Sequence, residues 1–153
     1  GAAGGLAVAL GSTLRSSGGV WFGWNGSVSD TSARRATRTE VDGINYATVP
    51  LQRRDYEQYY QGYANRVLWP TFHYRADAMQ YEQRFREGYR RCNEYLARKL
   101  LPELRPDDHI WIHDSHLIPM GHKLRAAGVT SHLGFFLHIP FPPYDVLRTV
   151  PEF

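Results

Sequence analysis

Residues 110–119, IWIHDSHLIP, decide the fold of this chain. The apolar residues that open the stretch predict the end of a buried strand, and Leu117–Pro119 predict the beginning of a helix. Between them lies Asp114, with a histidine on either side at His113 and His116. In an open α/β sheet, ligands bind at the carboxyl ends of strands, in the loop to the next helix. We therefore expect Asp114 to occupy a catalytic or sugar-binding position.

A second strand of the same kind is predicted over residues 134–139, GFFLHI, and it delivers His138 just before a proline-rich turn. Residues 117–127 between the strands are typical of a helix, which Gly128 ends. Strand, helix and strand within about 30 residues make a right-handed βαβ unit with parallel strands. Both strands then end at the same edge of the sheet, so that Asp114 and His138 face the same side.

Short elements are predicted in the first third of the chain. The pair Gly4–Gly5 opens a short helix; such a pair is usually only a loop, but it can also bring a phosphate close to free backbone N–H groups. A strand beginning at Val20 ends in a turn at Asn25–Gly26, and residues 27–39 are expected to form an exposed loop. Asp42–Gly43 indicates a tight turn between antiparallel strands.

Two longer helices are predicted in the middle of the chain. The first begins at Arg53, carries a row of tyrosines and ends over residues 67–70, before an aromatic loop at residues 71–74. The longest helix runs from about Ala76 to Leu101, with one apolar stripe and a charged opposite side. The stripe consists of Phe85, Tyr89, Cys92, Leu96 and Leu100. We interpret this helix as structural.

Composition sets the broad class of the protein. A chain of 153 residues, 42% apolar and 22% charged, is long enough for one domain with a core. The net charge is only +3 and no basic run occurs, which argues against a nucleic-acid surface. The apolar start is too short for a membrane span and lacks the basic region of a signal peptide. Cys92 is the single cysteine, so we expect a reducing compartment and a cytoplasmic protein.

The sequence lacks the motifs that mark other common kinds of active site. The sequence has no GxSxG elbow, no Walker loop and no HExxH spacing, and no second carboxylate faces Asp114. A lone carboxylate among many aromatic residues suits recognition of hydroxyl groups, or general-base work on an acceptor hydroxyl. The residues alone leave two plainer interpretations open. Asp114 could cap the following helix, and His138 could pack beneath the proline turn.

Five segments, in this order, resemble the trehalose-6-phosphate synthases, the retaining glycosyltransferases of family 20 with two Rossmann-like domains in the GT-B arrangement. The segments are GGLAVAL, GVWFGWNG, YYQGYANRVLWPTFHYR, IWIHDSHLIP and GFFLHIPFPP. The resemblance covers nearly the whole chain. It implies an α/β fold, a Rossmann-like parallel sheet with flanking helices and a small antiparallel hairpin, in which residues 1–153 form the N-terminal, acceptor-binding domain.

The resemblance also implies a reaction. Glucose would move from a nucleotide-diphosphate glucose, with UDP-glucose as the first expectation, to glucose 6-phosphate, giving trehalose 6-phosphate with retention of configuration. Gly5 would lie near the donor diphosphate, and His138 would face the transferred glucose and share the catalytic role with Asp114. The acceptor pocket would be lined by Trp24, Tyr60, Trp69 and Asp114. The implied enzyme needs no cofactor and no metal, binds neither nucleic acid nor membrane, and is compatible with a homo-oligomer.

Three departures from the family pattern qualify the function. The family's first strand, with an arginine for the acceptor phosphate, and its second, donor-binding domain lie outside this sequence, so we expect these 153 residues alone to be inactive. Ser115 stands where the family usually has tyrosine. A relative that uses another phosphorylated acceptor, such as glycerol 3-phosphate, therefore stays open. So does a catalytically silent module that binds or senses sugar phosphates.

Overall fold

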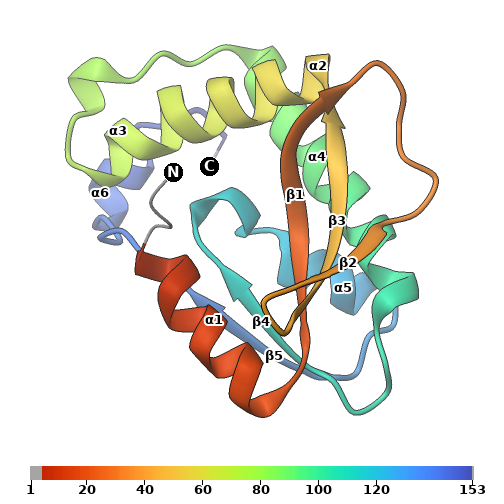
Figure 1. Cartoon of the computed structure of the whole chain (residues 1–153). Helices are drawn as coiled ribbons and strands as arrows, with labels where there is room; N and C mark the ends of the chain where they lie inside the picture. Colours follow the sequence, from red (N-terminus) through yellow and green to blue (C-terminus); the bar gives the residue numbers. More distant parts are fainter. Residues whose placement is uncertain (1–4, 153) are drawn as a thin grey trace. The chain divides into compact units, whose positions relative to one another are not determined.

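The computed structural model describes the backbone of residues 5–152 and the side chains of residues 10–152. The chain divides into two compact units, Gly1–Leu51 and Gln52–Phe153, and each is described by itself. The first unit contains a helix followed by a three-stranded sheet with the strand order β1-β3-β2 (Figure 1). Its elements are α1 (Gly5–Ser17), β1 (Val20–Ser29), β2 (Thr37–Val41) and β3 (Ile44–Gln52).

The predicted hairpin is confirmed. Strands β2 and β3 pair in antiparallel register, from Val41 opposite Ile44 outward. Asp42 and Gly43, which join them, have φ angles of 50° and 74°. Positive φ at both central residues is the mark of a type I′ turn, whose twist matches that of the strands beside it. The Asp-Gly pair therefore fixes the register of this hairpin.

The predicted turn at Asn25–Gly26 is wrong. Strand β1 continues through these residues to Ser29, and β2 begins at Thr37, so the expected loop over 27–39 is shorter. Gly26 has a φ angle of 81°, which a residue without Cβ adopts at little cost, so the strand changes direction locally without ending. The predicted helix at the start of the chain is confirmed as α1, which ends at Ser17. The next residue, Gly18, has a φ of 73°, as is common directly after a helix.

The second unit begins with a continuous helical stretch, which confirms the helical region predicted from Arg53. It consists of α2 (Arg53–Asp55), the π-helix η1 (Tyr56–Leu68) and α3 (Trp69–Phe72). The predicted end over residues 67–70 and the aromatic loop after it are wrong, because Thr71 and Phe72 belong to α3 and are fully buried. Pro70 lies in the first turn of α3, where a proline does not interrupt a helix.

The longest helix, α4, spans Gln83–Leu100 and begins later than predicted. Residues 76–78 form only a 3-10 turn, η2 (Ala76–Ala78), and Met79 is extended. The next backbone N–H, of Gln80, donates to the carbonyl of Arg66, which draws this segment onto the end of η1 and away from a helical path. The apolar stripe of α4 is buried as predicted, apart from Leu100, which is only half-buried.

Helices η1 and α4 approach closely through two glycines. A Cβ on Gly88 would collide with Cβ of Gln58 and would lie 3.1 Å from the Gln58 carbonyl carbon. A Cβ on Gly62 would collide with the ring of Phe85, and would lie 3.0 Å from the backbone oxygen of Glu57. Each helix thus supplies one glycine to the contact, and the spacing of the two helices depends on both.

The rest of the second unit is the predicted βαβ unit. Strands β4 (His109–His113) and β5 (His132–Phe136) pair in parallel, and α5 (Met120–Ala126) connects them (Figure 1). The second strand begins at His132, two residues earlier than predicted, and ends at Phe136, three residues earlier than predicted. The short elements are η3 (Leu101–Glu103), η4 (Ser115–Leu117) and α6 (Tyr144–Leu147). No helix in residues 5–152 is long and apolar enough to cross a membrane.

The two faces of the β4–β5 pair differ. Ile112 is buried, as the predicted buried strand requires, but its neighbour Trp111 is 55% exposed. Successive side chains of a strand point to opposite faces. The face that carries Ile112 is the more buried one, although Phe135 on it is 48% exposed, and the other face presents Trp111, His113 and Phe136 with much of their surface accessible.

Candidate functional site

Asp114 follows β4 directly and has an unusual backbone. Its φ of 74° and ψ of 168° fall in a region that is nearly confined to glycine and that costs a non-glycine residue on the order of 1–3 kcal/mol. Its N–H donates to the carbonyl of Phe136 at 2.8 Å, and its carboxylate accepts from the N–H of Ser115 at 2.9 Å. The side chain therefore caps only the short turn η4, and the N-cap of the longer helix α5 is Pro119. Backbone strain of this kind is concentrated at functional sites.

His113 and His138 meet beside Asp114. Nδ1 of His113 and Nε2 of His138 are 2.9 Å apart, and the two rings stack with their centroids 5.2 Å apart. Burial lowers the pKa of His113, the neighbouring His138 lowers it further, and Asp114 opposes the change. One imidazole N–H must then donate to the other ring. His138 is exposed and hydrogen-bonded, so the interpretation of a histidine packed beneath the proline turn is wrong.

Tyr60 reaches the same loop from helix η1. Its ring stacks on His116 with centroids 5.6 Å apart and an angle of 23° between the planes. It also stacks on Tyr56, with the ring centroids 5.8 Å apart. His116 is half-buried, and burial lowers its pKa, with Asp114 opposing the change. The structure therefore brings Tyr60, Asp114 and His138 to one edge of the β4–β5 pair.

We expect the histidine beneath Tyr60 to make folding sensitive to acid. Burial lowers the pKa of His116 below 6.5, so as the pH falls through this value the unfolded chain takes up the proton first. The free energy of unfolding should therefore fall below about pH 6.5, by at most about 1.4 kcal/mol per pH unit for one group. Above that value both states are neutral and the contribution is constant.

Urea unfolding of the natural-length polypeptide at about pH 7 and about pH 5 measures this effect. His116→Phe keeps a stacking ring and removes the proton site, so it should lose less stability between the two pH values than the unmodified protein. His122→Phe, at an exposed histidine of α5, serves as the control and should lose as much as the unmodified protein. An equal loss in all three proteins contradicts the assignment to His116.

The other predicted site residues are Trp69, Trp24 and Gly5. Trp69 begins α3, is 53% exposed and lies over the ring of His73, with centroids 4.1 Å apart. Trp24 lies in β1, where its indole N–H donates to the carbonyl of Ser27 at 2.7 Å. Gly5 is the first residue of α1. Trp24 and Gly5 belong to the first unit, and their roles stay predictions.

Helix α4 supplies two contacts that sequence reasoning missed. The hydroxyl of Tyr89 donates to the carbonyl of Ser115 at 2.6 Å, and the carboxamide N–H of Asn93 donates to the carbonyl of His116 at 3.0 Å. Tyr89 was predicted only as part of an apolar stripe. The available signal was Asn93 itself, since a polar amide next to Cys92 on the buried side of a helix needs a partner.

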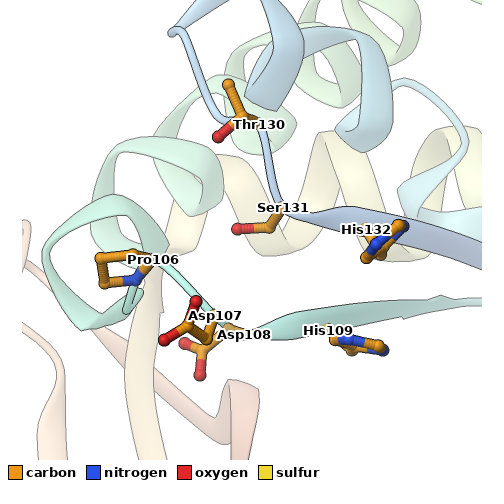
Figure 2. A pocket seen from close by; sticks show the side chains of 7 residues that line it. All are labelled: Pro106, Asp107, Asp108, His109, Thr130, Ser131 and His132. Carbon is orange, nitrogen blue, oxygen red and sulfur yellow. The ribbon is translucent and has the colours of Figure 1, made fainter.

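A cavity of about 300 Å³ lies at the opposite end of the two strands (Figure 2). It is lined by Pro106, Asp107, Asp108, His109, Thr130, Ser131 and His132. Asp107 and Asp108 lie on the loop before β4, and the rings of His109 and His132 lie next to each other (Figure 2), with centroids 5.0 Å apart. The cavity is therefore separated from Asp114 by the length of a strand. In the described part of the chain, no group of three or more His, Cys, Asp and Glu could hold a metal ion.

Known proteins resemble this chain along its whole length. The sequence profile of glycosyltransferase family 20 matches residues 1–153. A trehalose-6-phosphate synthase of Cronobacter sakazakii is 46% identical over 151 residues, which is 97% of this chain and 31% of that protein. This chain therefore spans about a third of the length of that relative.

Solved structures give the same result. An alpha,alpha-trehalose-phosphate synthase (UDP-forming) from Burkholderia vietnamiensis matches with a TM-score of 0.93 and 51% identity, over 97% of this chain and 32% of that one. Another, from Burkholderia xenovorans in complex with glucose-6-phosphate, matches with a TM-score of 0.91 and 53% identity, over 98% of this chain and 33% of that one. These matches confirm the predicted α/β fold, as the N-terminal part of a GT-B structure.

Proposed function

The chain belongs to glycosyltransferase family 20, and on that premise we propose that the polypeptide carrying it transfers glucose from UDP-glucose to glucose 6-phosphate. The product is trehalose 6-phosphate, formed with retention of configuration. In this proposal residues 1–153, which match the family profile throughout, form the acceptor-binding domain. The donor nucleotide is bound by a domain beyond these residues.

One observation carries the proposal. Asp114 is held in a strained backbone conformation at the carboxyl end of β4, beside the His113–His138 pair and the stacked ring of Tyr60. A solved relative with 53% identity over 98% of this chain is described as a complex with glucose-6-phosphate. The same relative is described as UDP-forming, which supports UDP-glucose as the donor.

Each predicted site residue receives a role in this reaction. Asp114 accepts hydrogen bonds from hydroxyls of the acceptor sugar, and His138 contacts the transferred glucose. Tyr60 lies near the acceptor phosphate, and Trp69 provides a flat wall against which a sugar ring packs. Trp24, in the first unit, keeps the acceptor-binding role that the family resemblance implies. Gly5 is the first residue of α1, where the backbone N–H groups have no partner within the helix and are proposed to bind the donor diphosphate.

The chemistry needs no covalent intermediate on the protein. The acceptor hydroxyl attacks the anomeric carbon from the side on which the diphosphate leaves, and its proton passes to the departing diphosphate oxygen. Attack and departure on the same side preserve the configuration. Catalysis then rests on holding the two sugars in a reactive geometry and on stabilising developing charge. No cofactor or metal takes part, and the leaving diphosphate is neutralised by basic side chains.

Mass spectrometry of reaction products tests the proposal. The natural-length polypeptide is incubated with UDP-, ADP- or GDP-glucose, each in combination with glucose 6-phosphate or glycerol 3-phosphate. A phosphorylated disaccharide from UDP-glucose and glucose 6-phosphate is the expected product. The same disaccharide from another nucleotide sugar would correct the donor and leave the acceptor as proposed.

A second acceptor is kept in this experiment because of Ser115. This side chain is 3% exposed and replaces a tyrosine that the family resemblance leads one to expect in the acceptor loop. A product formed from glycerol 3-phosphate alone would overturn glucose 6-phosphate as the acceptor. No product from any pair, together with saturable binding of glucose 6-phosphate in a titration, would instead identify a silent binding module.

We expect Trp69→Ala to weaken acceptor binding. The indole is exposed and lies over the ring of His73, so its loss removes a flat apolar surface without opening a cavity in the core. The KM for glucose 6-phosphate should rise about tenfold, the effect of one stacking contact of roughly 1–1.5 kcal/mol, with the KM for the donor unchanged. Tyr144→Ala removes another exposed aromatic ring and is the control. An unchanged acceptor KM would exclude Trp69 from the pocket.

A further inference from the structure

Two side chains of α4 hold consecutive carbonyls of the loop that follows Asp114. The hydroxyl of Tyr89 donates to the Ser115 carbonyl, and the carboxamide of Asn93 donates to the His116 carbonyl. The two donors are one helical turn apart, and the side chain of Asn93 also donates to the backbone oxygen of Tyr89 at 3.0 Å. Both residues are buried, with exposures of 6% and 0%. The contacts therefore form a fixed connection between the helix and the loop.

The hydroxyl of Tyr89 is a permanent donor. Burial raises its pKa well above the ordinary value, and a hydrogen bond with the backbone of Ile118 opposes the change only in part. The group is therefore protonated, and able to donate, at neutral pH. Its hydrogen bond reaches the turn η4, which Ser115 opens.

Asn93 is hard to explain by stability alone. Its carboxamide oxygen is buried and has no hydrogen-bond partner among the residues that the structure describes. A buried acceptor without a partner is destabilising, and an apolar side chain of the same shape would avoid that penalty. The amide does, however, donate a hydrogen bond to the His116 carbonyl, next to the imidazole ring that stacks on Tyr60.

The loop needs such a hold because of the backbone of Asp114. Its φ of 74° is one that a non-glycine residue adopts only when the surroundings impose it. On the β5 side, the carbonyl of Phe136 fixes the N–H of Asp114. On the other side, the fixed groups are the next two carbonyls, and both are held by α4.

We propose that Tyr89 and Asn93 are positioning residues for the transfer reaction. By holding Ser115 and His116 they place the Asp114 carboxylate and the Tyr60 ring in their working positions. They act through the loop and not on the substrate. This inference rests on the proposed function, in which Asp114 and Tyr60 bind the acceptor.

Tyr89→Phe in the natural-length polypeptide tests the inference, because it removes one hydroxyl and keeps the ring. We expect kcat to fall about tenfold, the rate equivalent of one hydrogen bond, and the KM for the donor to stay unchanged. Tyr63→Phe is the matched control, since its buried ring lies 4.7 Å from that of Tyr89 in the same aromatic cluster. An equal loss of kcat in both variants would show that Tyr89 has only a structural role in the aromatic cluster, and would overturn the inference.

A double-mutant cycle separates positioning from packing. If Tyr89 acts through Asp114, then Tyr89→Phe should lower the residual kcat little when Asp114→Asn is already present. Losses that multiply fully would show that the two residues act independently. That result contradicts the inference.

Hydrogen–deuterium exchange tests the inference without a measurement of enzymatic activity. Tyr89→Phe should speed exchange in a peptide covering residues 114–118 and leave the peptide of α5, residues 120–126, unchanged. If the polypeptide forms no product but Tyr89→Phe still shows this local change in exchange, the proposed function is refuted. The contact by which Tyr89 holds the loop is then still supported. Unchanged exchange over residues 114–118 overturns the inference in either case.

Discussion

Asp114→Asn is expected to lower kcat for glucosyl transfer by about 10²–10⁴ in the natural-length polypeptide, while the fold stays intact. The substitution removes the charge and basicity of the carboxylate and little else. Asparagine has nearly the same shape as aspartate, and its side-chain oxygen can still accept from the N–H of Ser115. The lost activity would then report the role of the carboxylate on the acceptor hydroxyls.

Steady-state kinetics with circular dichroism and thermal unfolding measure this effect. Asp107→Asn is a matched control, because Asp107 lies in the loop before the same strand and lines the cavity at its far end. The control should keep native turnover, and both variants should unfold at nearly the same temperature as the unmodified protein. Near-native turnover of Asp114→Asn would show that the central assignment of the site is wrong.

His138→Ala is expected to lower kcat by about a hundredfold, with the KM for glucose 6-phosphate little changed. The imidazole is proposed to contact the transferred glucose, so its loss affects the step in which charge develops on that sugar. The substitution also removes the partner of His113, which lies 2.9 Å away. In the unmodified protein, burial and the neighbouring His138 both lower the pKa of His113, so the substitution removes one of these two causes.

His132→Ala provides the comparison for His138. His132 opens β5 and lies beside His109, so the variant removes an exposed histidine at the opposite end of the same strand. Kinetics at saturating donor and acceptor should show a large loss only for His138→Ala. A loss of the same size in both variants would indicate a general effect on the β4–β5 pair and would remove His138 from the catalytic site.

The centre of the site could be predicted from the sequence, because local patterns determine it. An apolar run followed by polar residues marks the end of β4, and a helix-length segment before the next apolar run requires parallel pairing. These patterns predicted that Asp114 and His138 share an edge. The structure places both beside His113, which hydrogen-bonds to His138 and precedes Asp114.

Features that depend on distant partners could not be predicted. The tyrosine spacing after Arg53 suits an α-helix as well as a π-helix, and the sequence does not distinguish the two. The later start of α4 follows from a hydrogen bond between Gln80 and Arg66, whose closeness is a result of folding. The contact of Asn93 with His116 likewise joins residues on separate elements. Short-range patterns contain none of this information.

The two glycines between η1 and α4 have a consequence for engineering the enzyme. A common route to heat resistance replaces glycines inside helices with alanine, which usually stabilises by about 0.4–1 kcal/mol. At Gly62 and Gly88 the added methyl would instead push the helices apart, because each Cβ meets the opposite helix or its side chain. One of these helices carries Tyr60 and the other carries Tyr89. A library that aims at thermostability should therefore leave both positions unchanged, and look for its gains at exposed positions elsewhere.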